Sequence, residues 1–205
     1  MDVLAYERIA FHNGFRCIAG VDEAGRGSLA GPVVAASVVL PVGCIIPGVS
    51  DSKKITKSQR EKLFKEIYTF AVSVGVGVVG VAWIDRFNIR QASLLAMRLA
   101  VYNLTPSPDY LLIDGNVPIP FTVSQLPIIK GDLLSHSISA ASIVAKVSRD
   151  RLMEKHHQIY PQFDFKAHKG YPTRAHRQKV SDFGPCMLHR ITFKGVREFL
   201  RPALG

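Results

Sequence analysis

The sequence has few residues that could cross-link the chain through a disulfide or a structural metal. Its 205 residues include three cysteines, Cys17, Cys44 and Cys186, which lie far apart and form no Cys-x-x-Cys pair. So sparse and odd a set excludes a disulfide framework and a zinc site, and it is typical of a reducing compartment. The adjacent histidines His156 and His157 give no metal pattern either, because two ligands on one helix face need a spacing of four.

The sequence also lacks a continuous apolar helix long enough to cross a membrane. Residues 28–50 carry no charge, but prolines and glycines such as Pro32, Pro41 and Gly43 interrupt them. Residues 67–84 carry no charge either, yet their valines alternate with serine and glycine, which is the period of a strand. The N-terminus has Asp2 and Glu7 and no cleavable apolar core, so we predict a cytoplasmic protein.

The sequence has fewer acidic than basic residues. There are 16 Asp and Glu against 26 Lys and Arg, which gives a formal net charge of +10. Such a balance favours a polyanionic partner, either a nucleic acid or an anionic membrane surface. Much of the excess falls late in the chain, where the basic residues form either a solvated face or a surface that holds DNA; they are Lys166, Lys169, Arg174, His176, Arg177 and Lys179.

The pattern of strands and helices predicts an α/β fold, with a mixed β-sheet flanked by helices. We expect one domain over residues 1–205, with residues 173–205 as a small C-terminal helical segment packed on it. Thr56 and Gln59 have capping-box form, Asn88 can cap a helix that ends near 103, and Thr173 can cap another. The expected strands are 16–22, 33–40, 70–82, 110–113 and 127–130, and the other expected helices are 57–68 and 135–159.

Acidic residues come at the ends of three of these strands. Asp22 and Glu23 follow one, Asp114 follows another, and Asp132 follows the last. In open α/β sheets functional residues gather where strands end, and four converging carboxylates need a cation such as Mg²⁺ or Mn²⁺ among them. Neighbouring strand residues point to opposite faces, so Asp22 and Glu23 share a site only if the strand ends or bulges there. Taken singly, Asp114 before glycine is ordinary turn chemistry, and Asp132 suits a helix N-terminus.

The motifs around these acids resemble those of the bacterial ribonuclease HII family of type 2 ribonucleases H. The resemblance covers roughly residues 17–190, and every motif comes in family order. The matching segments are DEAGRG at 22–27, LAGPVV at 29–34, DSKK at 51–54, IDG at 113–115, KGD at 130–132, AASIVAKVSRD at 140–150 and HKGYPT at 168–173.

This resemblance implies a ribonuclease H-like fold and an endonuclease that hydrolyses RNA in RNA–DNA hybrids. It also implies cleavage on the 5′ side of ribonucleotides embedded in duplex DNA, leaving a 5′-phosphate and a 3′-hydroxyl. Two divalent ions, Mg²⁺ or Mn²⁺, are expected on the catalytic residues Asp22, Glu23, Asp114 and Asp132. The expected substrate-binding residues are Gly25, Arg26, Gly27, Lys53, Ser142, Lys146 and Tyr171.

The turn Gly25–Gly27 is implied to sense the ribose 2′-hydroxyl, and Tyr171 to pack at the junction nucleotide. Lys54 and Arg149 are expected to contact phosphate or support the site, and His168 and His176 to contact phosphate. Asp150 is expected to be an ion-pair partner rather than a metal ligand. Two alternatives stay open: a different metal-dependent nuclease on the same fold, or a non-catalytic nucleic-acid-binding protein. We predict a monomer with no membrane and no obligate protein partner.

Overall fold

The computed structural model describes residues 2–49 and 55–200, so the expected phosphate contacts Lys53 and Lys54 lie outside the described residues. A five-stranded sheet has the order β3-β2-β1-β4-β5. Its strands are β1 (Ile18–Ala24), β2 (Val33–Val39), β3 (Ser73–Val79), β4 (Tyr110–Asp114) and β5 (Ser124–Ile128). β2 is antiparallel to both of its neighbours, whereas β4 and β5 run parallel to β1, which confirms the predicted mixed sheet.

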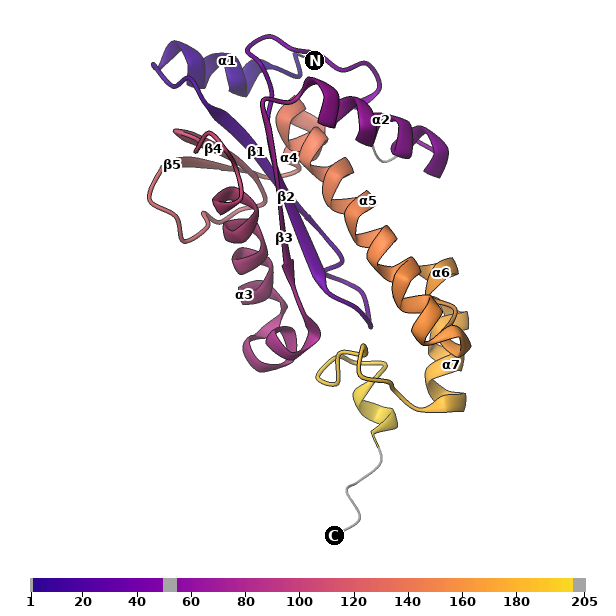
Figure 1. Ribbon diagram of the computed structural model, residues 1–205. Helices are drawn as coiled ribbons and strands as arrows, with labels where there is room; N and C mark the ends of the chain where they lie inside the picture. The colour runs from indigo at the N-terminus through magenta and orange to yellow at the C-terminus, as the bar shows by residue number, and fades with distance from the viewer. Residues whose placement is uncertain (1, 50–54, 201–205) are drawn as a thin grey trace.

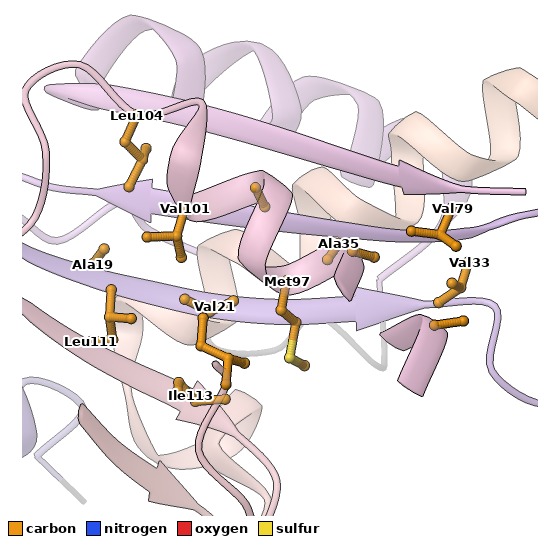
Figure 2. Packing of buried hydrophobic residues seen from close by; sticks show 14 of the residues in the cluster. Ala19, Val21, Val33, Ala35, Val79, Met97, Val101, Leu104, Leu111 and Ile113 are labelled. Atoms are coloured by element: carbon orange, nitrogen blue, oxygen red, sulfur yellow. The ribbon is translucent and has the colours of Figure 1, made fainter. Parts of the chain in front are cut away.

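Two long helices cover opposite faces of the sheet, as Figure 1 shows. α3 (Val81–Tyr102) packs on one face, against Val21 and Ala35 among others. Figure 2 shows this apolar layer, with Met97 of α3 lying over the strands. α5 (His136–Ile159) and α2 (Lys57–Phe70) cover the other face, against residues such as Ala36. Alternate residues of one strand therefore point to α3 and to α5.

Glycine lets a helix and the sheet come very close at one point. A Cβ added to Gly20 would lie 2.1 Å from the backbone carbon of Ser137 in the first turn of α5. No larger residue fits there without displacing the helix. Gly20 and Ala24 face α5, so Asp22 between them lies on the α5 side, whereas Glu23 points to the α3 side.

The predicted helix caps are confirmed. Thr56 and Gln59 form a reciprocal capping box at the start of α2, and the Thr173 side chain accepts from the His176 amide at the start of α7 (Arg174–Phe183). The Ser135 hydroxyl caps α5 in the same way. The remaining short elements are α1 (Ala5–His12), α4 (Gly131–Leu134), η2 (Pro161–Phe163), α6 (Phe165–His168) and η3 (Arg197–Phe199).

Several predicted boundaries are wrong. The strand predicted at 70–82 is only β3, because α2 extends through Phe70 and α3 already begins at Val81. Asn88 interrupts α3 with φ 68° and caps its second part by accepting from the Gln91 amide. The strand predicted at 127–130 lies earlier, as β5, and Lys130 adopts a left-handed conformation. Likewise β1 lies two residues later than the predicted 16–22.

The C-terminal segment folds back onto the turn between β1 and β2. The Gly31 amide donates to the Leu188 carbonyl at 2.8 Å, and the Arg190 amide donates to the Leu29 carbonyl at 2.8 Å. In Figure 1 this yellow segment lies at the end of the sheet from which the β1–β2 turn projects. Among residues 2–49 and 55–200, none of the helices combines the length and apolar character needed to span a bilayer.

Candidate functional site

Asp22 and Glu23 approach one point of the sheet from opposite faces. Both lie where β1 pairs regularly with β2, and this pairing continues to Ala24. The expectation that β1 ends or bulges at these residues is therefore wrong. Instead it is β4 that stops: its pairing with β1 ends at Val21, and Asp114 is its last residue. Because β4 ends next to Asp22 and Glu23, both of these carboxylates are close enough to Asp114 for its charge to raise their pKa values.

The two β1 carboxylates are unusually costly to ionise. Asp22 is 6 % exposed, and burial, followed by the charges of Glu23 and Asp114, raises its pKa well above the ordinary value. Hydrogen bonds from the Glu23 amide and from Ser142 offset only part of this rise. Burial also raises the pKa of Glu23, against the opposing effect of Arg26, and its Oε2 is buried with no hydrogen-bond partner. A cation is the group that this cluster would stabilise best.

Asp132 approaches Asp114 through its backbone amide, and it lies on a helix rather than at a strand end. It lies in the first turn of α4, is 4 % exposed, and its amide donates to Asp114 Oδ1 at 3.4 Å. The Ser139 hydroxyl of α5 donates to the Asp132 carbonyl at 2.6 Å and so fixes the short helix. Within the described part of the chain, no three His, Cys, Asp or Glu side chains are already arranged as a metal site.

A cavity of about 370 Å³ adjoins the acids and gathers most of the expected substrate-binding residues. Its lining includes Glu23, Gly25, Arg26, Gly27, Ser142, Lys146 and Tyr171, together with Arg60 of α2. Glu23 and Arg26 also line a smaller cavity of about 50 Å³, which contains Asp114, Asn116, Arg90 and Ser93. Sequence reasoning missed Arg60 and Arg90, since a single arginine on an amphipathic helix looks like any solvated residue.

Tyr171 lies against two cations of α5. Lys146 Nζ is 5.0 Å and the Arg149 guanidinium carbon 5.2 Å from its ring centroid. Lys146 pairs with Asp150 at 2.7 Å, so Asp150 is the predicted ion-pair partner. Arg149 is fully buried and donates to the carbonyls of Ala30, Pro32 and Lys169, so it supports the site and does not contact phosphate.

Two histidines beneath Tyr171 are buried, and a third is half-buried. The expectation that His168 and His176 contact phosphate is wrong, because His168 stacks on His176, whose Nε2 is 3.1 Å from Nε2 of His189. His176 Nδ1 donates to the Tyr171 carbonyl, and His189 Nδ1 accepts from the Cys186 amide. His189 Nε2 must then donate to His176, so all four ring nitrogens are satisfied only while both rings are neutral. Lys169 is also buried and pairs with Glu154.

We expect the folded protein to lose stability as the pH falls from 6.5 to 4. Burial lowers the pKa of His176 and of His189 to about 4, from an ordinary value of 6.5, and charge repulsion from His168 at His176 and from His176 at His189 adds to the effect. The unfolded chain therefore binds more protons in this window, and each histidine costs on the order of 2–3 kcal/mol of stability across it. Thermal melting followed by circular dichroism between pH 7.5 and 4.5 measures the loss.

A His189→Gln variant is expected to be less stable than the wild type at pH 7.5 but to lose less on acidification. His12→Asn is the matched control, because His12 is exposed on α1. A His189→Gln melting curve with the same pH dependence as the wild type would contradict the assignment of the acid loss to this cluster.

Comparisons with known proteins point to one family. The sequence model of the family Ribonuclease HII matches residues 19–196. The chain is 55 % identical over 195 residues to ribonuclease HII of Geobacter sulfurreducens, covering 95 % of this chain and 90 % of the relative. The ribonuclease H2 structure from Pyrococcus horikoshii OT3 is similar at TM-score 0.76 and 29 % identity, over 89 % of this chain and 96 % of that one. The structure of Bst-RNase HIII in complex with Mn²⁺ shares the fold at TM-score 0.68 and 20 % identity, over 92 % of this chain and 70 % of that one.

Proposed function

Because this chain belongs to the ribonuclease HII family and is an endoribonuclease, we propose that it cuts duplex DNA on the 5′ side of an embedded ribonucleotide and hydrolyses the RNA strand of RNA–DNA hybrids. One observation carries the proposal: the buried carboxylate of Glu23 opens onto the same cavity as the Gly25–Gly27 turn and Tyr171. A group of acids suited to phosphodiester chemistry thus lies beside residues suited to holding a nucleotide.

The donor set fits divalent cations. It consists of carboxylate oxygens, one of them the unpartnered Glu23 Oε2. The pKa values of Asp22 and Glu23 are raised, so a positive charge would offset a repulsion that the fold compensates only in part. We assign Asp22, Glu23, Asp114 and Asp132 to hold two Mg²⁺ or Mn²⁺ ions. Bound there, such ions would activate a water molecule and stabilise the charge on the leaving oxygen.

The remaining residues bind and orient the substrate. Arg26 is exposed beside Glu23 and can contact a phosphate through its guanidinium. Lys146 and Tyr171 lie together on the cavity wall, where the ring can stack on a sugar or base while the lysine attracts the phosphate. No side-chain nucleophile is needed, and attack by water leaves a 5′-phosphate and a 3′-hydroxyl.

The proposal is tested with a labelled DNA duplex that contains one ribonucleotide, incubated with the protein in Mg²⁺ or Mn²⁺. We expect a single cut on the 5′ side of the ribonucleotide, no cut without metal, and no cut in an all-DNA duplex of the same sequence. Equal cleavage of the all-DNA duplex would indicate a general nuclease on this fold. Salt-sensitive binding without cleavage would indicate a binding protein, and a cyclic phosphate product would contradict attack by water.

A further inference from the structure

Arg190 is buried directly beneath the Gly25–Gly27 turn, although it lies more than 150 residues away in the sequence. It is 0 % exposed. Nη2 donates to the Gly25 carbonyl at 2.7 Å and Nη1 to the Arg26 carbonyl at 2.8 Å. Nε and Nη2 both donate to the Gly31 carbonyl, at 3.1 and 2.9 Å. One guanidinium therefore links the Gly25–Gly27 turn to Gly31, close to the start of β2.

These bonds fix the direction of the peptide groups in the turn. In a trans peptide unit the carbonyl and the following amide point in opposite directions. Since the Gly25 and Arg26 carbonyls point inward to Arg190, the amides of Arg26 and Gly27 point away from the protein interior. Neither amide donates to another backbone group within the described residues, and both residues are exposed on the cavity wall.

Burying the Arg190 guanidinium costs free energy, which indicates that the orientation it gives to the turn has a function. A buried guanidinium whose hydrogen bonds go only to neutral carbonyls is costly, and burial lowers the pKa of Arg190 to about 9. Lysine could not replace it, because an ammonium lacks the planar fork that reaches several carbonyls at once. The neighbouring His189 pairs with Ala30 across a β-bridge and so anchors the same segment to the turn.

We propose that Arg190 is a positioning residue for ribose recognition, holding the amides of Arg26 and Gly27 outward as paired donors to the 2′-hydroxyl of the bound ribonucleotide. This rests on the proposed function. It extends that function by assigning the alignment of the turn to a residue that contacts no substrate.

The test measures the affinity ratio for two duplexes that differ in one 2′-hydroxyl. Arg190→Lys is made in an Asp22→Asn background, which prevents cleavage, and Kd is measured for the ribonucleotide duplex and its all-DNA counterpart. The Asp22→Asn parent is expected to prefer the ribonucleotide by roughly five- to tenfold, and Arg190→Lys to lower the ratio to about one. Simple destabilisation would weaken both duplexes equally and leave the ratio unchanged.

The control is Ile67→Val, a buried substitution in α2 that does not line the cavity, which should lower stability and keep the preference. An unchanged ratio in Arg190→Lys, or no preference in the parent, would overturn the proposal. Failure of the wild type to cut the ribonucleotide duplex would instead overturn the proposed function.

A second measurement needs no arginine variant and so stands even if Arg190→Lys does not fold. In ¹⁵N-labelled Asp22→Asn protein, the amide resonances of Arg26 and Gly27 should shift further downfield with the ribonucleotide duplex than with DNA. The Ser28 amide, which faces the Gly25 carbonyl at 3.4 Å, is the internal reference. Equal shifts of Arg26 and Gly27 with the two duplexes would overturn the proposal.

Discussion

An Asp22→Asn variant is expected to lose cleavage activity by on the order of a thousandfold or more and yet to unfold at a higher temperature than the wild type. The activity falls because a neutral amide is a poor ligand for a divalent cation, and Asp22 lies at the centre of the carboxylate cluster. The rise in stability has a separate cause, which is that the folded protein holds this carboxylate buried beside Glu23 and Asp114.

The expected gain is a rise of a few degrees in melting temperature at pH 7, roughly 2–8 °C, which is the size of an ordinary single-residue effect in a chain of this length. Asparagine keeps the oxygen that accepts from the Glu23 amide and removes only the charge. Because the folded pKa of Asp22 is raised, its ionisation destabilises the wild type at neutral pH. The difference between the two proteins should therefore shrink as the pH falls through the raised pKa toward 3.8.

Melting must be measured in a chelator, because bound metal would stabilise the wild type selectively. Asp182→Asn is the matched control, since Asp182 is exposed on α7 far along the chain from the cluster and should alter neither activity nor stability by much. An Asp22→Asn protein that melts below the wild type in chelator would show that the carboxylate is not under electrostatic strain.

The approach of Asp22, Glu23 and Asp114 to one another could be anticipated because each lies near the C-terminal end of an apolar strand, and the ends of neighbouring parallel strands meet. Asp114 is the clearest example, since the short strand before it is apolar and buried. Asp132 lies on a helix and not at the end of a strand, because β5 ends at Ile128 and a left-handed Lys130 then starts a short helix. No sequence signal marks that conformation in a lysine.

The role of Arg190 could not be predicted from the sequence, although its side chain is fully buried and makes four hydrogen bonds to carbonyls. Its carbonyl acceptors lie 159 to 165 positions away, and a carbonyl carries no side-chain identity that a pattern could match. An arginine near the C-terminus, with no motif around it, looks like a surface residue. Arg149 belongs to a recognisable motif, but the motif does not show its contacts. These contacts are again carbonyls, those of Ala30 and Pro32 between β1 and β2.

The two glycines of the Gly25–Gly27 turn are expected to respond in opposite ways to the same substitution. Gly25 has φ +96°, and a Cβ there would lie 2.0 Å from Nε of Arg149, which is buried and cannot move aside. Gly25→Ala should therefore cost about 2–4 kcal/mol of stability, through both backbone strain and overlap. Chemical denaturation measures this loss, and activity should fall with the folded fraction.

Gly27→Ala should leave the stability within about 0.5 kcal/mol of the wild type, because a Cβ at Gly27 would meet no protein atom within 4 Å. The substitution should instead impair substrate binding, because Gly27 lines the cavity beside the acids. We expect kcat/KM on the ribonucleotide duplex to fall by roughly tenfold or more, because the methyl group would hold the sugar away from the amide donors. Wild-type kcat/KM in a normally folded Gly27→Ala protein would mean that no substrate backbone approaches this turn closely, and the glycine would then serve only the turn's own conformation.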